Sequence, residues 1–496
     1  MVKPAIFVYA VCFLFLSQNA EAEFVLQALC EFPATNAASI NAPPQQPSGG
    51  LVEASDGSFY GTARGGSNYA GLVSGNGTIF RLTKAGALTR IFSFNGTNGN
   101  IPSGGLVLGN DGCLYGVTRN GGSNYLGAND SIFSVNGTIF KITTNGVFTS
   151  LFLFKGTNGT WPVGRLVLGN DGNFYGTTVY GGNGFTGPQS GNGTVFRYST
   201  NGVFNVLNYF NGTNGCFLFA GLTLGDDGNF YGATEFGGNK YTGGINSGNG
   251  TLFQITTNGV LTTLAYFNGT NGSTPLAGLT EGLDKNFYGT TRNGGIGYNG
   301  ANVLTGNGTV FQITTNGVLT TLLFFNGTNG GNPSSGLTLG TDGNLYGSTT
   351  WIGTNDATHF GTLFRITTNG LLTTLVYLNG TNGIHPRTDM ILGSDGNLYG
   401  AMVDIQASQL PDGSLGSTFR LVQPPVFNSI NPTNDGMAIS WASFTNAVYN
   451  VEYKASLVST SWSSLATNVS TPSNSASFTD RSLNSTQRFY RVRLLP

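Results

Sequence analysis

The chain has 496 residues, a formal net charge of -1 and only 9% charged side chains, together with 78 glycines and 12% aromatic residues. Soluble domains usually carry about 25% charged residues and about half this share of glycine. The charge balance disfavours nucleic acid and anionic membranes as partners, because no basic field is present to attract them. The 39% hydrophobic content argues against disorder and favours a turn-rich, all-β fold.

The first 22 residues have the organisation of a secretory signal peptide. Lys3 supplies the positive charge, Ala5 to Leu16 form an apolar stretch too short to span a bilayer, and small residues surround the cleavage site at Ala22. We therefore expect cleavage after Ala22 and a secreted or cell-surface protein. No later apolar run reaches the roughly 18 residues of a membrane helix, so no transmembrane segment is expected.

A motif built on an Asp-Gly turn and a strand ending in Tyr-Gly occurs seven times. Its turn aspartates are Asp56, Asp111, Asp171, Asp227, Asp284, Asp342 and Asp395, at steps of 55, 60, 56, 57, 58 and 53 residues. A fixed period of this length is typical of repeat architectures. We interpret the aspartates as hairpin residues, because Asp-Gly favours tight turns between strands.

Each repeat predicts four strands. In one repeat they are residues 278–282, 286–291, 308–314 and 318–325, rich in β-branched, Leu and aromatic residues. Aromatic residues recur at one point of the second strand and one point of the third, and we expect them to pack neighbouring sheets together. They are Tyr60, Tyr115, Tyr175, Tyr231, Tyr288, Tyr346 and Tyr399, and Phe80, Phe140, Phe196, Phe253, Phe311, Phe364 and Phe419.

The strand count predicts how the repeats close into a ring. Residues 24–32, before the first repeat, match the fourth-strand pattern of residues 88–94, whereas the seventh repeat stops after its third strand at residues 417–422. The N-terminal strand is therefore expected to complete the last sheet, which leaves no sheet edge unpaired. Seven such four-stranded antiparallel sheets predict a seven-bladed β-propeller over residues 23–422.

Two alternating motifs carry a family resemblance: G-L-x-L-G-x-D-G-N-[FL]-Y-G-x-T and G-T-[ILV]-F-[RKQ]-I-T-T-N-G-V-L-T-T-L. Over residues 24–422 the chain resembles the Gloeo/Verruco (GloVer) repeat family of exported bacterial proteins. The resemblance implies a propeller-like extracellular protein and brings no activity or catalytic residue with it. The fifth copy has Lys285 in place of the turn glycine, and the seventh lacks the Gly-Gly segment after its second strand. We expect altered turns in these two repeats.

Beyond residues 423–425 the repeat ends, and apolar residues alternate with polar ones as in the strands of a small sandwich. The segments around Trp441, over residues 449–454 and over residues 488–492 resemble a fibronectin type III-like module. Residues 423–496 are therefore expected to form a separate β-sandwich with Trp441 in its core.

The loop lengths predict which face could bind a partner. Tight turns join the first strand to the second and the third to the fourth, whereas the longer loops emerge together on the other face, where binding residues are favoured. On that face the side chains vary from repeat to repeat. The candidate residues are Arg64, Arg119, Glu235 and Arg292, four positions after the second-strand tyrosine, and Trp161, Arg165, Phe236, Trp351, His385 and Arg387 in neighbouring loops.

Aromatic side chains beside arginines suit the faces and hydroxyls of sugars, and they also anchor protein partners. We therefore hypothesise a monomeric, non-enzymatic scaffold that binds an extracellular carbohydrate or protein. In the alternative structural interpretation, the arginines line the central tunnel paired with backbone carbonyls, and the aromatic residues close the edges of the blades.

An enzymatic alternative is a propeller hydrolase or lyase that acts on a polysaccharide. Two carboxylates suffice for glycoside cleavage, and Glu235 with Asp404 is the candidate pair, although their repeats lie far apart around the ring. His359 and His385 are the only histidines, and no nucleophile elbow or phosphate loop occurs. The sequence assigns no catalytic residue, no cofactor and no metal site. Cys30, Cys113 and Cys216 predict neither a disulfide framework nor a zinc site.

Overall fold

The computed structural model describes residues 24–32, 44–65, 76–122, 136–187, 189–243, 247–300, 302–351, 360–402, 416–422, 427–443, 448–456, 461–470, 475–482 and 488–494. The predicted signal peptide, residues 1–22, lies outside these ranges. Within them every regular element is a β-strand, in agreement with the all-β expectation. The chain divides into two units, of which one comprises Leu26–Gly393 and Leu398–Arg420, and the other has Leu421–Pro496 as its main part.

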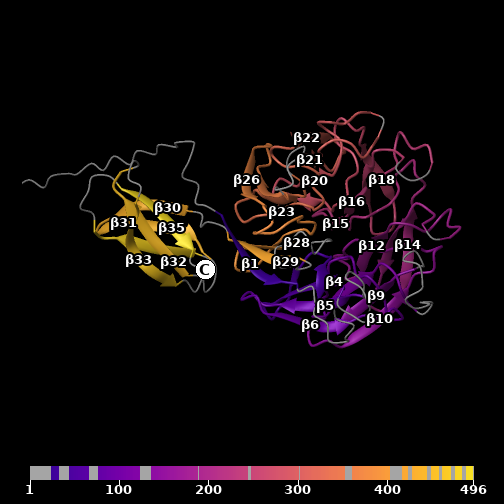
Figure 1. Ribbon diagram of the computed structural model, residues 1–496, viewed down its shortest axis with the longest axis horizontal. Helices are drawn as coiled ribbons and strands as arrows, with labels where there is room; N and C mark the ends of the chain where they lie inside the picture. The colour runs from indigo at the N-terminus through magenta and orange to yellow at the C-terminus, as the bar shows by residue number, and fades with distance from the viewer. Residues whose placement is uncertain are drawn as a thin grey trace, which may run out of the picture. The chain divides into compact units, whose positions relative to one another are not determined.

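Four-stranded antiparallel sheets repeat along the first unit and follow one another around a common centre (Figure 1). In one of them the strands β11 (Val167–Leu168), β12 (Phe174–Thr178), β13 (Thr194–Tyr198) and β14 (Phe204–Tyr209) lie side by side in chain order. Before it along the chain, one sheet with this order comprises β3 (Val52–Glu53), β4 (Phe59–Gly65), β5 (Thr78–Leu82) and β6 (Leu88–Ser93), and the next comprises β7 (Val107–Leu108), β8 (Leu114–Thr118), β9 (Thr138–Ile142) and β10 (Phe148–Leu153). After it come the sheet of β15 (Thr223–Leu224), β16 (Phe230–Thr234), β17 (Thr251–Ile255) and β18 (Leu261–Tyr266) and the sheet of β19 (Thr280–Glu281), β20 (Phe287–Thr291), β21 (Thr309–Ile313) and β22 (Leu319–Phe324). A further sheet comprises β23 (Thr338–Leu339), β24 (Leu345–Thr349), β25 (Thr362–Ile366) and β26 (Leu372–Tyr377). A further short strand, β2 (Gln45–Pro47), pairs with β4.

The two ends of the repeat region meet in one sheet. The strand order there is β1-β29-β28-β27, in which β1 (Val25–Glu31) comes from the start of the chain and β27 (Ile391–Leu392), β28 (Leu398–Met402) and β29 (Ser417–Val422) from the last repeat. The N-terminal strand thus supplies the fourth strand that the last repeat lacks, as the strand count predicts.

The recurrent aspartate and tyrosine of the motif are bonded to each other. In the fourth repeat the Tyr231 hydroxyl donates to Asp227 Oδ2 at 2.7 Å, and Asp227 Oδ1 accepts from the backbone N–H of Asn229 at 3.0 Å. The same tyrosine-to-aspartate bond, at 2.7–3.0 Å, is made by Asp56, Asp111, Asp171, Asp284 and Asp342. These aspartates are therefore turn residues that also tie the turn to the second strand.

The glycine after each tyrosine makes room for the third-strand phenylalanine. Gly176 pairs with Phe196 across the sheet, and a Cβ on Gly176 would lie 2.5 Å from Phe196 Cζ. Aromatic rings also join neighbouring sheets, since Tyr175 packs on Phe230 of the next sheet with ring centroids 4.1 Å apart. The recurrent aromatic residues are thus packing residues, as expected from the sequence.

The turn of the fifth repeat keeps the geometry of the others, so the altered turn expected there is wrong. Lys285 adopts a φ of 65°, in the left-handed region that Gly228 occupies in the preceding repeat with a φ of 78°. Its backbone N–H donates to Gly282 O at 3.0 Å, which closes the turn. The tight hairpin imposes this conformation on a side-chain-bearing residue at a cost of roughly 1–2 kcal/mol. The corresponding segment of the seventh repeat lies outside the described residues.

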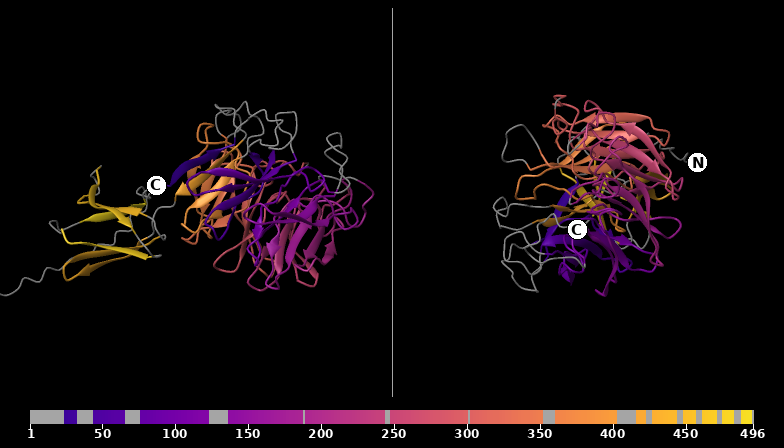
Figure 2. Two further views of the ribbon diagram at one scale, coloured as in Figure 1. Left: turned by 90° about the horizontal axis from the view of Figure 1, so that it is seen from below. Right: turned by 90° about the vertical axis from the view of Figure 1, so that its right-hand side faces the viewer.

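The second unit contains two three-stranded antiparallel sheets. Their strands are β30 (Phe427–Thr433), β31 (Gly436–Ala442) and β34 (Ser475–Asp480) in one, and β33 (Ser463–Ser470), β32 (Val448–Lys454) and β35 (Phe489–Leu494) in the other. Figure 2 shows them in two layers. Trp441 and Tyr449 are fully buried with ring centroids 5.6 Å apart. Trp441 is therefore a core residue, as expected.

Candidate functional site

A central channel runs along the innermost residues of the first unit. In each repeat this residue stands immediately before the buried Leu or Met that precedes the first strand. The seven residues are Gly50, Gly105, Arg165, Gly221, Gly278, Gly336 and Asp389, and all of them except Gly336 line one cavity. Successive members touch: a Cβ on Gly105 would lie 3.0 Å from Gly50 O and 3.5 Å from Arg165 Cδ, and one on Gly50 would lie 3.6 Å from Asp389 O. The first and last repeats are thus neighbours around the channel.

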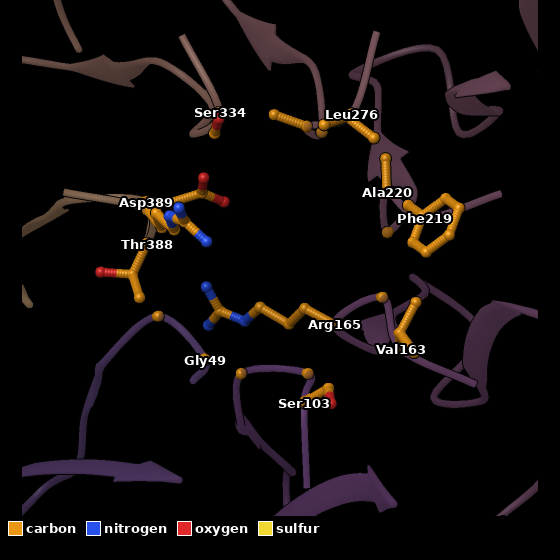
Figure 3. A pocket seen from close by; sticks show the side chains of 18 of the residues that line it. Gly49, Ser103, Val163, Arg165, Phe219, Ala220, Leu276, Ser334, Thr388 and Asp389 are labelled. Carbon is orange, nitrogen blue, oxygen red and sulfur yellow. The ribbon is translucent and has the colours of Figure 1, made fainter. Parts of the chain in front are cut away.

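Arg165 and Asp389 are the two members of this inner set that carry side chains. Both extend into a cavity of about 320 Å³ (Figure 3). The backbone N–H of Gly336 donates to Asp389 Oδ1 at 2.5 Å. Burial lowers the pKa of Arg165, and the charge of Asp389 acts in the opposite direction. Burial also raises the pKa of Asp389, although the residue is exposed to solvent in the cavity. These seven equivalent positions therefore carry one group of each charge sign.

The residue two positions earlier in each repeat forms the next level of the wall. These residues are Ser48, Ser103, Val163, Phe219, Leu276, Ser334 and Arg387. The apolar members Val163, Phe219 and Leu276 come from consecutive repeats and lie on one side, while Ser334 and Asp389 lie on the other (Figure 3). The cavity therefore has an apolar side and a polar side.

Four predicted arginines gather at this level. Arg64, Arg119 and Arg292, each four positions after a second-strand tyrosine, line a cavity of about 300 Å³ together with Arg387. Within the described residues no hydrogen bond or ion pair joins these guanidinium groups to another side chain. Arg119 instead stacks on Trp161, with Cζ 3.6 Å from the ring centroid. The tunnel-lining interpretation is therefore right about their position, whereas their pairing with carbonyls is not seen.

The arginines influence one another electrostatically. Burial lowers the pKa of Arg119 to about 10, and the charge of Arg64 lowers it as well. Burial of their surroundings and then Arg387 lower the pKa of Arg64, and burial and then Arg292 lower the pKa of Arg387, although both side chains are exposed to solvent in the cavity. At a pKa of about 10 the Arg119 guanidinium stays charged at neutral pH. The cavity thus concentrates positive charge in a chain whose net charge is -1.

The backbone is left-handed at the start of each loop that supplies the cavity wall. The residue at the start of each loop into the channel has a φ of 43–62°; the seven are Gln46, Ile101, Trp161, Phe217, Thr274, Asn332 and His385. The carbonyl of Ile101 accepts from Arg119 N at 2.9 Å, and that of Thr274 accepts from Arg292 N at 3.1 Å. Such strain persists only where surrounding bonds enforce it. These bonds hold the arginine position next to the loop that supplies the cavity wall.

The aromatic candidates do not form a rim around the cavity. Trp161 and Phe236, 6% and 4% exposed, are buried in a cluster with Tyr180 and Phe217. Since their rings cover one another, they present no free face for a sugar, contrary to the stacking hypothesis. Trp351 is 55% exposed, and it does not line the cavity.

The titratable candidates outside the cavity are Glu235 and His385. Glu235 is 8% exposed and does not line the cavity; burial raises its pKa to about 7, and Arg292 lowers it. His385 is half-buried, and burial and then Arg387 lower its pKa. Asp404, the carboxylate paired with Glu235 in the enzymatic hypothesis, and His359 lie outside the described residues.

Three further features bear on ligand classes. Among the described residues no group of three or more His, Cys, Asp or Glu side chains could hold a metal ion. Cys30, Cys113 and Cys216 are free thiols. In the same ranges no helix has the length and apolar character needed to cross a membrane.

Sequence reasoning missed most of the cavity wall. Ser48, Val163, Leu276 and Asp389 were not candidates, yet they line the cavity. These residues share a feature that the sequence shows: each stands one or three positions before the buried Leu or Met at the start of its repeat, and the residue type there differs from repeat to repeat. The position four residues after the second-strand tyrosine, which holds the arginines, varies in the same way.

A family model described as the Gloeobacter/Verrucomicrobia repeat matches residues 31–246 and 298–424. No curated protein matches the chain. Among solved structures, α-L-arabinanase from Penicillium chrysogenum complexed with arabinobiose is 12% identical, with a TM-score of 0.40, covering 80% of this chain and 98% of that one. The GH93 α-L-arabinofuranosidase of Fusarium graminearum is 13% identical, with a TM-score of 0.37 and coverages of 81% and 98%. A gluconolactonase from Xanthomonas campestris is 10% identical, with a TM-score of 0.36 and coverages of 81% and 90%. Likeness at this level carries no argument about activity.

Proposed function

Since the chain belongs to the Gloeobacter/Verrucomicrobia repeat family, we propose that residues 23–422 form a seven-bladed β-propeller closed by the N-terminal strand. Residues 1–22 are a signal peptide that directs export, and residues 423–496 form a fibronectin type III-like β-sandwich. In this proposal the exported protein is a non-enzymatic binding module, and its ligand is a carbohydrate that enters the central channel.

The observation that carries the proposal is where the repeats differ. The turn aspartates, tyrosines, glycines and phenylalanines that build the sheets stay the same from repeat to repeat. The side chains that change, among them Arg64, Phe219 and Arg387, line one cavity. Variation on a constant frame is the pattern expected of a binding site on a rigid scaffold.

The cavity favours a carbohydrate over a protein partner. Its volume of about 300 Å³ is at the lower end of the range for small-molecule pockets, whereas a stable protein interface needs about 800 Å² per partner. The hydroxyls of Ser48, Ser103 and Ser334 suit the hydroxyls of a sugar, and Phe219 offers an apolar surface for the face of a ring.

A glycan array tests this proposal with the mature protein and a variant whose channel is blocked. Leu276→Trp places a bulky side chain in the cavity, and Leu371→Trp, at a position that is 68% exposed, is the matched control. We expect glycan binding that Leu276→Trp abolishes and Leu371→Trp preserves, with both variants folded by circular dichroism. Binding that survives Leu276→Trp contradicts the channel site, and binding to no glycan contradicts the carbohydrate function.

The second candidate function is a polysaccharide hydrolase or lyase. The observation that favours it is the buried carboxyl of Glu235, whose pKa of about 7 suits a general acid. Release of reducing ends from acidic and neutral polysaccharides, lost in Glu235→Gln, is the expected result of this alternative. No release from any of them by the wild-type protein rejects it.

A further inference from the structure

We propose that the sugar recognised in the channel carries a carboxylate, so that the site binds one hexuronic acid unit, either free or at the end of a chain. This inference rests on the proposed carbohydrate function and adds the charge and size of the ligand. The carboxylate lies against the cluster of Arg64, Arg119, Arg292 and Arg387, and the ring lies against Phe219.

The charge of the cavity points to an anion. Four guanidinium groups line it, and within the described residues none of them is hydrogen-bonded or ion-paired to another side chain. Two carboxyls lie nearby, Glu235 within the influence of Arg292 and Asp389 within that of Arg165. The arginines outnumber them, and gathering like charges is unfavourable in the free protein. An anionic ligand relieves that repulsion, and a carboxylate matches the planar fork of a guanidinium with two oxygens.

The apolar side of the cavity distinguishes a sugar acid from a simple anion. Val163, Phe219 and Leu276 lie on that side, and a pyranose ring can place its C–H face there. Each of the three serine hydroxyls donates to a backbone carbonyl, so its oxygen, like the carboxylate of Asp389, can accept a hydrogen bond from a sugar hydroxyl. Inorganic phosphate would leave the apolar side unoccupied, so a sugar acid uses more of the site.

The inner level limits how much of a chain can enter. Arg165 and Asp389 extend into the cavity where the other repeats have glycine, and the adjoining cavity lined by the four arginines measures about 300 Å³. A single sugar unit fits a pocket of this size. The channel therefore suits the end of an acidic chain or a free sugar acid, and it does not suit a polymer threaded through.

Isothermal titration calorimetry with the mature protein tests the inference. The probes are galacturonate and glucuronate, the neutral galactose and glucose, tri-galacturonate and inorganic phosphate. We expect uronates to bind at least about tenfold more tightly than the neutral sugars, as a lost charge-assisted contact is commonly worth that factor or more. Tighter binding of the trimer identifies a chain end as the source of the ligand, and equal binding identifies the free sugar; both support the inference.

Two variants locate the binding. Arg387→Gln and Arg64→Gln each remove one guanidinium from the cavity and should weaken uronate binding about tenfold. Arg81→Gln is the matched control, since Arg81 lies 3.2 Å from Asp56 at a hairpin turn and outside the cavity; it should leave binding unchanged. Two cavity variants are used so that the binding measurement remains possible if one of them folds poorly. Thermal unfolding identifies a poorly folded variant.

Three outcomes overturn the inference. Neutral sugars that bind as tightly as uronates reject the charge but leave the carbohydrate function intact. Phosphate that binds as tightly as the uronates shows a general anion site. Binding of no saccharide rejects this inference and the proposed function together.

Discussion

Arg165 and Asp389 occupy the same position of two different repeats, and both extend into one cavity where the other five repeats have glycine. Seven repeats with the same strand residues therefore surround a cavity whose lining differs from repeat to repeat. The frame residues are shared by nearly all repeats, so the few positions that differ determine the charge and shape of the channel.

Removing the tyrosine hydroxyl tests the role of the turn aspartates. In Tyr231→Phe the ring still stacks on Phe287, at a centroid distance of 3.9 Å, but the 2.7 Å bond to Asp227 and the 2.7 Å bond from Gln254 Nε2 are lost. We expect the free energy of unfolding to fall by about 1–2 kcal/mol, measured by urea denaturation. Tyr266→Phe, at a 38% exposed position whose hydroxyl makes no hydrogen bond within the described residues, should change it little. Equal effects of the two changes would contradict the account.

The glycine of the Tyr-Gly pair should resist substitution. In Gly176→Ala the new methyl group meets Phe196 at 2.5 Å, so the ring or the strand must shift. We expect a loss of about 1–3 kcal/mol from overpacking, visible as a lower melting temperature. Gly331→Ala is the control, because a Cβ there meets only ordinary contacts at 3.7 Å and beyond. An unchanged melting temperature in Gly176→Ala would show that the sheet accommodates the methyl group.

Glu235 should make stability depend on pH. Its pKa in the folded protein, about 7, lies above the ordinary 4.5, so the folded state binds its proton more tightly than the unfolded state does. This stability is present below about pH 4.5 and is lost as the pH rises through 7. Relative to Glu235→Gln, the wild-type protein should lose roughly 3 kcal/mol between pH 4.5 and pH 8. Denaturation of both proteins across this range measures the difference, and a constant difference would be evidence against a buried, unpaired carboxyl.

Phe219 should contribute to ligand binding more than to stability. Phe219 is half-buried and lines the cavity. Phe219→Ala removes the apolar surface against which we place the sugar ring, and we expect galacturonate affinity to fall by about fivefold to tenfold. Phe324→Ala, at a position that is 42% exposed and outside the cavity, is the control. Calorimetric affinities that respond equally to both changes would place the sugar elsewhere.

The salt dependence of the affinity should show how much the charge of the ligand contributes to binding. Raising the ionic strength from about 0.01 M to about 1 M shortens the Debye length from roughly 30 Å to roughly 3 Å. We expect the affinity for galacturonate to fall by more than tenfold over this range, because the arginines attract its carboxylate, while the weak affinity for galactose stays constant. Calorimetry at four salt concentrations measures both. A galacturonate affinity that does not change with salt argues against an electrostatic site.

Much of the frame could be predicted from the sequence, because its residues act locally. The Asp-Gly turn, the four strands of each repeat and the pairing of β1 with β29 follow from turn chemistry and the strand count. Lys285 was misjudged for a physical reason: the turn geometry is set by the whole hairpin, which holds one lysine in the left-handed region.

The candidate site was predicted in part. The arginines were identified because they break the repeat, and the ring brings them together. Trp161 and Phe236 were misjudged, because sequence shows that an aromatic residue lies in a loop but not that other aromatic residues cover it. The left-handed conformation of Trp161 was also beyond sequence reasoning, since a residue before proline normally favours extended backbone.

A crystal structure of the mature protein soaked with galacturonate shows whether the cavity binds a sugar acid. We expect density for one sugar in the cavity, with its carboxylate within hydrogen-bond distance of Arg387 or a neighbouring arginine and its ring against Phe219. An empty channel beside a sugar bound elsewhere on the protein would contradict it.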